Sequence, residues 1–208
     1  MSPSVEMIVT SGTFSLDGGT WEVDNNVYLI GDDSEVLVID PAHDHQAILE
    51  TIGDRKVAGI ICTHGHDDHI GQAVAVAEMT GAPISLHPKD LMLWDVVHPG
   101  VIPNELSEGQ VLEVAGLVVK VLHTPGHSPG GVCLHLPELE VLISGDTLFQ
   151  GGPGATGRSF SDFQTILDSI REQILTLPSG TKVLPGHGGE TTVDDESKDY
   201  HAWVTRGR

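Results

Sequence analysis

The sequence predicts one α/β (α+β) domain in which two β-sheets pack together with helices outside them. Two observations favour this fold. Strand-like segments with alternating or β-branched apolar residues are followed by a helical segment, and this order occurs twice along the chain. The length of 208 residues also suits a single domain, residues 1–208, with a substantial core.

The first half of the chain begins with strands and continues into helices. Alternation and β-branched residues predict strands at residues 6–10, 26–30, 35–40, 57–63 and 82–87. The turn at residues 31–34 predicts a hairpin connection between the second and third of these. Apolar spacing predicts helices at residues 45–54 and 70–80, the second closed by Gly81.

Residues 88–110 lie between the two halves and are predicted to be irregular. Pro88, Pro99 and Pro103 interrupt regular structure, whereas Trp94 makes the segment more apolar than a simple linker. Because a loop of this length in a compact domain is usually functional, we expect it to form one wall of a cleft.

The second half repeats the order of strands followed by helix. Strands are predicted at residues 111–114, 117–123, 132–136, 141–144 and 181–184. A continuous apolar stripe predicts a helix at residues 161–177, with Ser161 as its N-cap. The polar tail, residues 193–208, is predicted to contain a short helix that carries Trp203.

The charge of the chain excludes partners rather than selecting one. Thirty Asp and Glu residues against ten Lys and Arg residues give a formal net charge of −20. Nucleic-acid affinity comes mostly from cationic contacts to phosphate, so we expect no nucleic-acid partner. The same charge disfavours an anionic membrane, and no segment approaches the roughly 18 apolar residues of a membrane-spanning helix.

Two features bear on the cellular compartment. The first six residues lack the basic and apolar regions of a signal peptide, so a cytoplasmic location is expected. Cys62 and Cys133 both lie within apolar strand-like segments, which predicts two buried free thiols rather than a disulfide. A thiolate ligand at Cys62 would have to point away from the side that His64 uses.

The strongest functional signal is the segment Thr63-His64-Gly65-His66-Asp67-Asp68-His69. It holds three imidazoles and two carboxylates directly after a buried strand, and both groups are common ligands of divalent metals. His64, His66 and Asp68 alternate, so they point to one side of an extended segment. The segment therefore predicts a metal site, with Asp67 expected to be solvated or a hydrogen-bond partner.

Three further candidate ligands follow strands in loops rich in small residues: His127, Asp146 and His187. Glycines beside each of them allow the close backbone approach that converging loops require. The complete set of candidate metal ligands is His64, His66, Asp68, His69, His127, Asp146 and His187. Five imidazoles and two carboxylates are enough for two metals with one carboxylate bridging them.

The other histidines are expected to lie outside the metal site. Five are interpreted as surface residues or hydrogen-bonded core residues: His43, His45, His98, His135 and His201. His87 and His123 end strands near the expected cleft, where they could support the site without binding metal.

The ordered motifs resemble those of the metallo-β-lactamase-fold hydrolases, from about residue 26 to residue 187. The motifs that carry the resemblance are residues 63–69, Gly126-His127, Gly145-Asp146 and Gly186-His187, and Asp40 matches the family's first motif. The resemblance implies a four-layer αββα sandwich with the metals at one edge of the sheets. It also implies that Asp40 supports a histidine ligand or the loop that carries one.

The resemblance divides the candidate ligands between two metals. It implies that the first metal is bound by His64, His66 and His127. It implies that the second is bound by Asp68, His69 and His187. Asp146 is then expected to bridge the two metals.

Within this family the chain is similar to glyoxalase II and its small thioesterase relatives. Residues 145–149 followed by Gly157-Arg158-Ser159 are similar to that branch, although Phe160 and Ser161 intervene before Asp162. Classical β-lactamases generally lack a histidine at the position of His69, and nucleases of the family would favour a basic surface. Few basic residues follow His187, so a thiol carrier other than glutathione is an equal alternative.

We therefore expect a metal-dependent hydrolase of a small-molecule thioester. A metal-bridging hydroxide would attack the acyl carbonyl, because metal binding lowers the pKa of water from about 15.7 towards ~7. Asp68 and Asp146 are the expected catalytic residues, acting with the metal-bound hydroxide. The cofactors are expected to be two divalent ions, zinc first, with iron or manganese as alternatives.

Alternatives to thioester hydrolysis stay open on the sequence alone. They are lactone or ester hydrolysis at the same site, a mononuclear-iron persulfide dioxygenase and a metal-binding module without enzymatic activity. The oligomeric state also stays open, with a homodimer as one option.

Residues 152–159 mimic a phosphate-binding P-loop but do not match its chemistry. Arg158 stands where the loop's lysine belongs, and Pro153 removes a backbone donor. We expect instead a flexible cleft loop that presents Arg158 to a carboxylate or phosphate of the substrate, with a plain surface arginine as the alternative. Substrate choice is expected to lie in residues 88–110 and 149–160.

Overall fold

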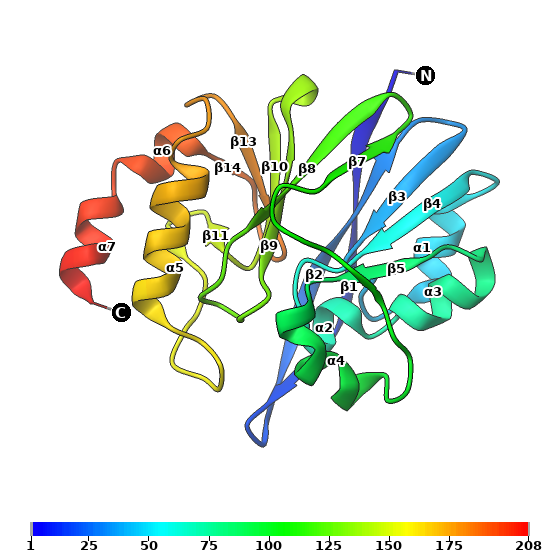
Figure 1. Cartoon of the computed structure of the whole chain (residues 1–208), viewed down its shortest axis with the longest axis horizontal. Helices are drawn as coiled ribbons and strands as arrows, with labels where there is room; N and C mark the ends of the chain where they lie inside the picture. The colour runs from blue at the N-terminus through cyan, green and yellow to red at the C-terminus, as the bar shows by residue number, and fades with distance from the viewer. Residues whose placement is uncertain (1, 208) are drawn as a thin grey trace.

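Two six-stranded sheets lie face to face at the centre of the structure, a computed structural model that describes residues 2–207 (Figure 1). The first sheet is formed, in hydrogen-bonded order, by β1 (Ser4–Leu16), β2 (Gly19–Gly31), β3 (Glu35–Ile39), β4 (Lys56–Ile61), β5 (Ile84–Leu86) and β6 (Asn104–Glu105). The second is formed by β14 (Thr191–Thr192), β13 (Lys182–Pro185), β10 (Val141–Gly145), β9 (Val132–Leu136), β8 (Leu117–His123) and β7 (Val111–Val114). A small separate ribbon pairs β11 (Leu148–Phe149) with β12 (Gly152–Pro153).

Helices cover the outer face of each sheet, which gives four layers (Figure 1). The first sheet is covered by α1 (His45–Ile52), α2 (Asp67–Ile70), α3 (Ala73–Thr80) and α4 (Leu91–Val97). The second is covered by α5 (Phe163–Ser169), α6 (Val193–Ser197) and α7 (Tyr200–Arg206). The αββα sandwich predicted from the sequence is confirmed. None of the helices between residues 2 and 207 has the length and apolar content needed to cross a membrane.

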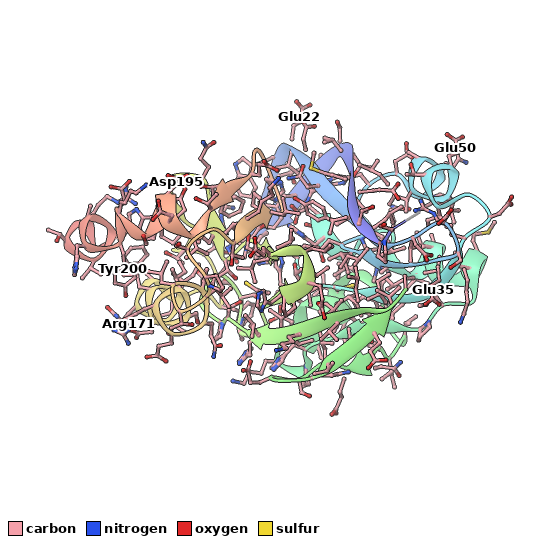
Figure 2. All side chains as sticks on the ribbon, turned by 90° about the horizontal axis from the view of Figure 1, so that it is seen from above. Glu22, Glu35, Glu50, Arg171, Asp195 and Tyr200 are labelled. Carbon is pink, nitrogen blue, oxygen red and sulfur yellow. The ribbon has the colours of Figure 1, made fainter. Side chains whose placement is uncertain are left out.

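Three apolar clusters fill the three interfaces between these layers. Successive side chains of a strand point to opposite faces of its sheet. In β4, Ile60 packs towards the outer helices and Ile61 towards the second sheet. In β9, Leu134 packs between the sheets, whereas Cys133 packs towards α5. Acidic side chains such as Glu22, by contrast, point outward into solvent (Figure 2).

The hairpin of β1 and β2 is much longer than the sequence predicts. Its strands pair without interruption from Ser4 opposite Gly31 to Leu16 opposite Gly19, whereas only residues 6–10 and 26–30 were expected. The far half of the hairpin leaves most side chains exposed or half-buried, so no strong hydrophobic alternation marks it. The turn Asp17-Gly18, where both residues have positive φ, was the available signal.

The segment 88–110 is more regular than predicted. It begins with a 3-10 turn, Pro88–Asp90, continues as α4 and ends with β6. Trp94 is completely buried, and its indole Nε1 donates a hydrogen bond to the carbonyl of Val101 at 2.8 Å. The prediction of an irregular segment is therefore wrong, because the apolar residues of 91–97 form a short helix packed on the first sheet.

Two predicted helices differ in detail from the structure. The first begins at Asp67 and is divided into α2 and α3. The second begins at Phe163, because the carboxylate of Asp162 accepts from the backbone N–H of Thr165 at 2.7 Å. The Oγ of Ser161 instead accepts from the backbone of Gly157 at 2.9 Å. The N-cap prediction is thus wrong by one residue. The tail forms α6 and α7 and buries Trp203, as expected.

Candidate metal centre

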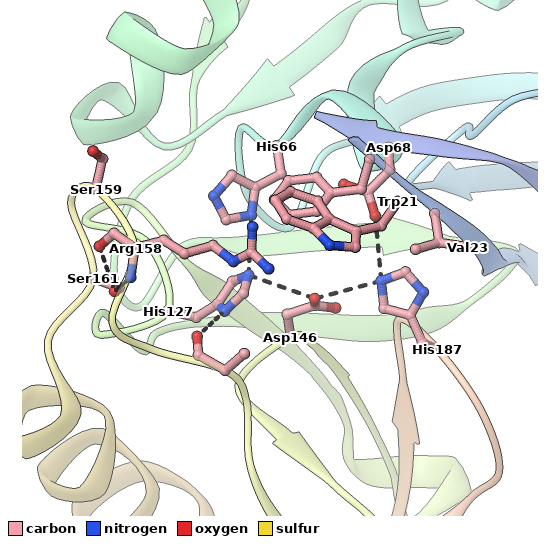
Figure 3. A pocket seen from close by; sticks show the side chains of 12 residues that line it. Trp21, Val23, His66, Asp68, His127, Asp146, Arg158, Ser159, Ser161 and His187 are labelled. Carbon is pink, nitrogen blue, oxygen red and sulfur yellow. Dashed lines mark hydrogen bonds and ion pairs between the residues drawn. The ribbon is translucent and has the colours of Figure 1, made fainter. Parts of the chain in front are cut away.

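All seven candidate ligands lie together at one edge of the two sheets. The loop after β4 and the start of α2 carry His64, His66, Asp68 and His69. The other sheet contributes His127 from the β8–β9 loop, Asp146 after β10 and His187 after β13. Figure 3 shows five of them, from both sheets, around one pocket. His64 and His187, which are 123 positions apart in the chain, thus lie in one site because strands from both sheets end at this edge.

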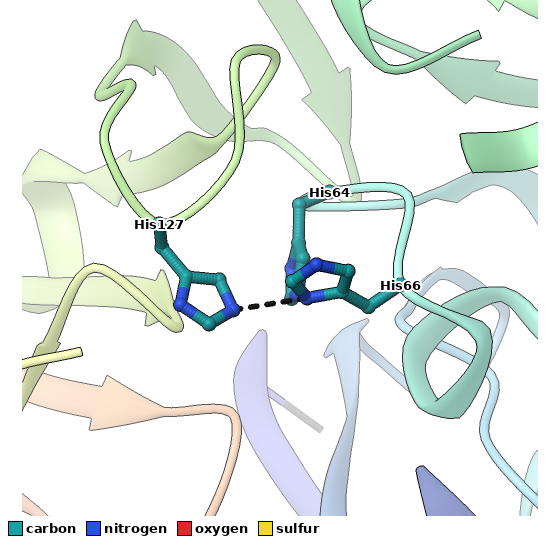
Figure 4. A group of neighbouring side chains, drawn as sticks. All are labelled: His64, His66 and His127. Atoms are coloured by element: carbon teal, nitrogen blue, oxygen red, sulfur yellow. Dashed lines mark hydrogen bonds between the residues drawn. The ribbon is translucent and has the colours of Figure 1, made fainter. Parts of the chain in front are cut away.

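The first ligand group consists of His64, His66 and His127. The Nδ1 atom of His66 lies 3.0 Å from Nε2 of His64 and 3.0 Å from Nε2 of His127. Figure 4 shows the three rings converging from two loops. One nitrogen from each ring therefore faces a common point, and the three could hold a metal ion.

The second ligand group consists of Asp68, His69 and His187. Nε2 of His187 lies 3.3 Å from both Nε2 of His69 and Oδ2 of Asp68. Nε2 of His69 lies 3.6 Å from the same carboxylate oxygen. This second set of converging donor atoms could also hold a metal ion.

Asp146 lies between the two groups. Its Oδ1 is 3.3 Å from Nε2 of His69, and its Oδ2 is 3.5 Å from Nε2 of both His127 and His187. Oδ1 is buried and has no hydrogen-bond partner among residues 2–207. A buried carboxylate oxygen without a hydrogen bond is costly, and a bound cation would satisfy it. The donor set therefore fits divalent metals, with Asp146 placed to contact both.

Hydrogen bonds outside the two groups orient three of the imidazoles. Nδ1 of His69 lies 2.9 Å from Oδ2 of Asp40, and Nδ1 of His127 lies 2.8 Å from the carbonyl oxygen of Ala155. Nδ1 of His187 lies 2.7 Å from the carbonyl oxygen of Asp24. Because each of these oxygens accepts an N–H, each ring keeps its Nε2 lone pair for a metal.

Asp40 supports both a ligand and the loop that carries others. Besides His69, its carboxylate accepts from the backbone N–H of Thr63 at 2.7 Å and from the Thr63 hydroxyl at 2.6 Å. That hydroxyl lies 3.1 Å from Nδ1 of His64 and can accept a hydrogen bond from its N–H. The two roles expected for Asp40 are therefore both present.

The two groups differ in their electrostatics. Burial lowers the pKa of His64, and it lowers the pKa of His66 to about 3, so these rings are neutral. Burial opposes the charge of His187 as well, but its hydrogen bonds with Asp146 and Asp68 outweigh this and raise its pKa to about 10. Without metal, the second group thus holds protons that a metal would displace.

Strand β2 supports the second group through residues that the sequence did not single out. Nδ2 of Asn25 donates to Oδ2 of Asp68 at 3.1 Å, and Oδ1 of Asn25 lies 2.7 Å from Nε2 of His43. Nδ2 of Asn26 donates to the carbonyl oxygens of Pro185 and Gly188, which flank His187, at 2.9 and 3.0 Å. His43 therefore orients the amide that binds Asp68, a candidate ligand.

A pocket of about 210 Å³ opens beside the candidate ligands. Its apolar wall comes from Phe14, Trp21 and Val23 of the β1–β2 hairpin, and its opposite wall from residues 155–161. The expectation that residues 88–110 form a wall is wrong for this pocket, because none of them lines it. The hairpin takes that place instead.

Arg158 joins the two walls of the pocket. Its guanidinium carbon lies 3.7 Å from the centroid of the Trp21 ring, a cation–π contact (Figure 3). The backbone N–H of the next residue, Ser159, donates to the carboxylate of Asp17 at the hairpin tip at 3.0 Å. Asp67 holds the hairpin from the other side by accepting from the backbone N–H of Ser15 at 3.0 Å. Asp67 is thus a hydrogen-bond partner, as expected.

The fold and this site define a metal-dependent class of protein, and comparison with known proteins gives its family. Residues 20–187 match the Metallo-beta-lactamase superfamily, so the chain belongs to that superfamily. A probable metallo-hydrolase of Bacillus subtilis, YqgX, is 36% identical over 81% of this chain and 87% of its own length. The hydroxyacylglutathione hydrolase GloC of Haemophilus influenzae is 32% identical over 83% of this chain and 90% of its own length.

Solved structures show the same likeness. BLEG-1, a B3 metallo-beta-lactamase, has a TM-score of 0.76 and 31% identity, covering 91% of this chain and 97% of its own. A di-iron-bound form of TTHA1623 has a TM-score of 0.76 and 32% identity, covering 85% and 93%. ETHE1 from Myxococcus xanthus has a TM-score of 0.71 and 27% identity, covering 92% and 82%. Membership of this superfamily implies an enzyme that binds divalent metal, and the names of YqgX and GloC both state a hydrolase.

Proposed function

We propose that the protein is a dinuclear metal-dependent hydrolase of small-molecule thioesters. The observation that carries this proposal is the position of Asp146, whose carboxylate lies within 3.3 to 3.5 Å of imidazole nitrogens from both ligand groups. We assign His64, His66 and His127 to one metal and Asp68, His69 and His187 to the other, with Asp146 shared. Zinc suits these nitrogen and oxygen donors, and the di-iron form of TTHA1623 makes iron an alternative.

Two divalent ions, when bound, supply hydroxide near neutral pH and polarise an acyl carbonyl. The chain's own residues do the rest. Asp40 and the carbonyl oxygens of Asp24 and Ala155 keep the imidazole lone pairs directed inward. Asp68 and Asp146 provide the negative charge that balances the metals. No separate protein nucleophile is needed, because the metals would supply hydroxide as the attacking group, and the thiolate is a good leaving group.

The pocket walls supply the substrate contacts in this proposal. Phe14, Trp21 and Val23 present an apolar surface to the acyl or thiol part of the substrate and exclude water from that side. Among residues 2–207, Arg158 is the one Lys or Arg residue that lines the pocket, so we assign it to an anionic group of the substrate. The likeness to GloC supports a hydroxyacyl thioester as the first substrate to test.

A substrate panel tests this proposal. Purified protein is assayed with thioesters of glutathione, coenzyme A and other thiols, beside a lactone, an oxygen ester and a β-lactam. We expect thioesters to have the highest kcat/KM and His66→Ala to abolish turnover while the circular dichroism stays unchanged. The β-lactam is included because BLEG-1 is called a β-lactamase. Its likeness to this chain runs against the expectation that His69 excludes β-lactam hydrolysis.

The outcomes separate the alternatives. Equal activity on every ester and thioester would remove the substrate claim and leave the metal centre. One iron per chain, together with oxygen consumption on a persulfide, would replace hydrolysis by the dioxygenase alternative. The likeness to ETHE1 is the reason to test for this activity. Metal binding without turnover on any substrate would favour the non-enzymatic module.

A further inference from the structure

Asp90 is a buried carboxylate that contacts the loops carrying the first ligand group. It ends the 3-10 turn Pro88–Asp90 and is 0% exposed. Its Oδ2 accepts from the backbone N–H of Gly65 at 2.8 Å and from the hydroxyl of Ser128 at 2.7 Å. Its Oδ1 accepts from the backbone N–H of Gly130 at 2.6 Å. One side chain therefore binds two loops that come from different sheets.

Two of the three donors are adjacent to histidines of the first ligand group, and the third, Gly130, lies three residues after His127. Gly65 lies between His64 and His66, and Ser128 directly follows His127. The carboxylate thus connects the two loops that carry His66 and His127, whose Nδ1 and Nε2 atoms lie 3.0 Å apart. Within residues 2–207 it makes no hydrogen bond to Asp68 or His69, which follow Gly65 in the same segment, or to the loop that carries His187.

Two glycines permit this close approach. A Cβ on Gly130 would lie 2.7 Å from the carboxylate carbon of Asp90, and one on Gly65 would lie 2.9 Å from Cβ of Leu93. Neither glycine has a positive φ, so close packing rather than backbone conformation requires them. A buried carboxylate is costly unless it is fully hydrogen-bonded, and here two backbone N–H groups and the Ser128 hydroxyl provide the bonds.

We propose that Asp90 is a positioning residue that fixes the separation of the two loops of the first ligand group. It thereby raises the metal affinity of the first group more than that of the second, because the β8–β9 loop carries a ligand of the first group alone. This inference rests on the proposed function only in that the first group binds metal. It also gives the segment 88–110 a role: it holds the metal loops instead of lining the pocket.

The test measures Co²⁺ binding to each group separately, by the visible absorption of the bound ion. His187→Ala leaves the first group complete, and His127→Ala leaves the second complete. In metal-stripped protein we expect Asp90→Asn to weaken Co²⁺ binding about 10–100-fold in the His187→Ala background. In the His127→Ala background the loss should be much smaller, because the β8–β9 loop that Asp90 fixes carries no ligand of the second group.

Two further variants complete the design. Asp95→Asn makes the same change of charge at an exposed position of α4 and should leave both constants unchanged. Ser128→Ala removes one of the three donors and should weaken only the first group, by less than Asp90→Asn does. If Asp90→Asn fails to fold, the same two backgrounds with Ser128→Ala decide the question.

Equal losses in both backgrounds would show that Asp90 stabilises the fold as a whole, which would overturn the proposal. No loss in the His187→Ala background would overturn it as well. Failure of the wild-type protein to bind Co²⁺ is a different outcome, because it would remove the proposed metal centre itself and, with it, this role of Asp90.

Discussion

The two ligand groups are supported in different ways. Besides direct contacts to His64 and His127, the first group has the backbones of its two loops joined by Asp90. The second group is held through side chains, because Asn25 binds Asp68 directly and Asp40 binds His69 directly. Where a side chain contacts a ligand directly, the metal affinity depends on the chemistry of that side chain. Where a side chain joins two loops, the metal affinity depends on how far apart the loops are held.

The largest expected effect comes from removing one ligand of each group. His127→Ala and His187→Ala should each leave one metal of two per chain, and kcat/KM should fall by more than the roughly 10–100-fold typical of changes outside the ligand sphere. Metal content by mass spectrometry and thioester turnover provide the measurement. Two metals retained in either variant would contradict the division into two groups.

A smaller effect is expected from the residues that support the ligands. Asn25→Ala should weaken only the second group, about 10-fold, because it removes the partner of Asp68. Asp40→Asn should weaken both groups, since Asp40 contacts His69 and also Thr63, which supports His64. Competition with a chelator in the His127→Ala and His187→Ala backgrounds measures each constant. A loss confined to one group in Asp40→Asn would show that the Thr63 contact does not matter.

Removal of metal should lower stability by a moderate amount. A ligand present at 100 times its Kd stabilises the folded state by about 2.7 kcal/mol, which for a chain of this size corresponds to about 5–11 °C in Tm per site. Calorimetry of the wild type with and without a chelator should show a difference in Tm equal to the sum for two sites. The same difference in His127→Ala should be about half as large. An identical Tm with and without metal would argue against both groups as metal sites.

The ligands and the supporting residues differ in how far the sequence reveals them. His64, His66 and Asp68 stand in one short motif after a buried strand, so local spacing was enough to select them. Asp90 and Asn25 act on residues at least 25 positions away in the chain, and neither has a neighbouring pattern that points to its partner. Such roles follow only from how the loops fold back on each other.

The fold shows the same division. Strands with one or two buried faces were predicted because their apolar residues follow the period of the sheet. The far half of the β1–β2 hairpin was missed, since its faces are mostly exposed and packing does not select apolar residues there. The N-cap of α5 was placed on Ser161 instead of Asp162, because both residue types cap helices well and only the backbone decides between them.

The central claim is that one catalytic unit contains two metals that share Asp146. Metal-stripped protein titrated with Zn²⁺, with thioester hydrolysis measured at each addition, tests this claim most directly. We predict that activity continues to rise until two equivalents per chain are bound. Full activity at one equivalent, with no further gain from a second, would contradict it.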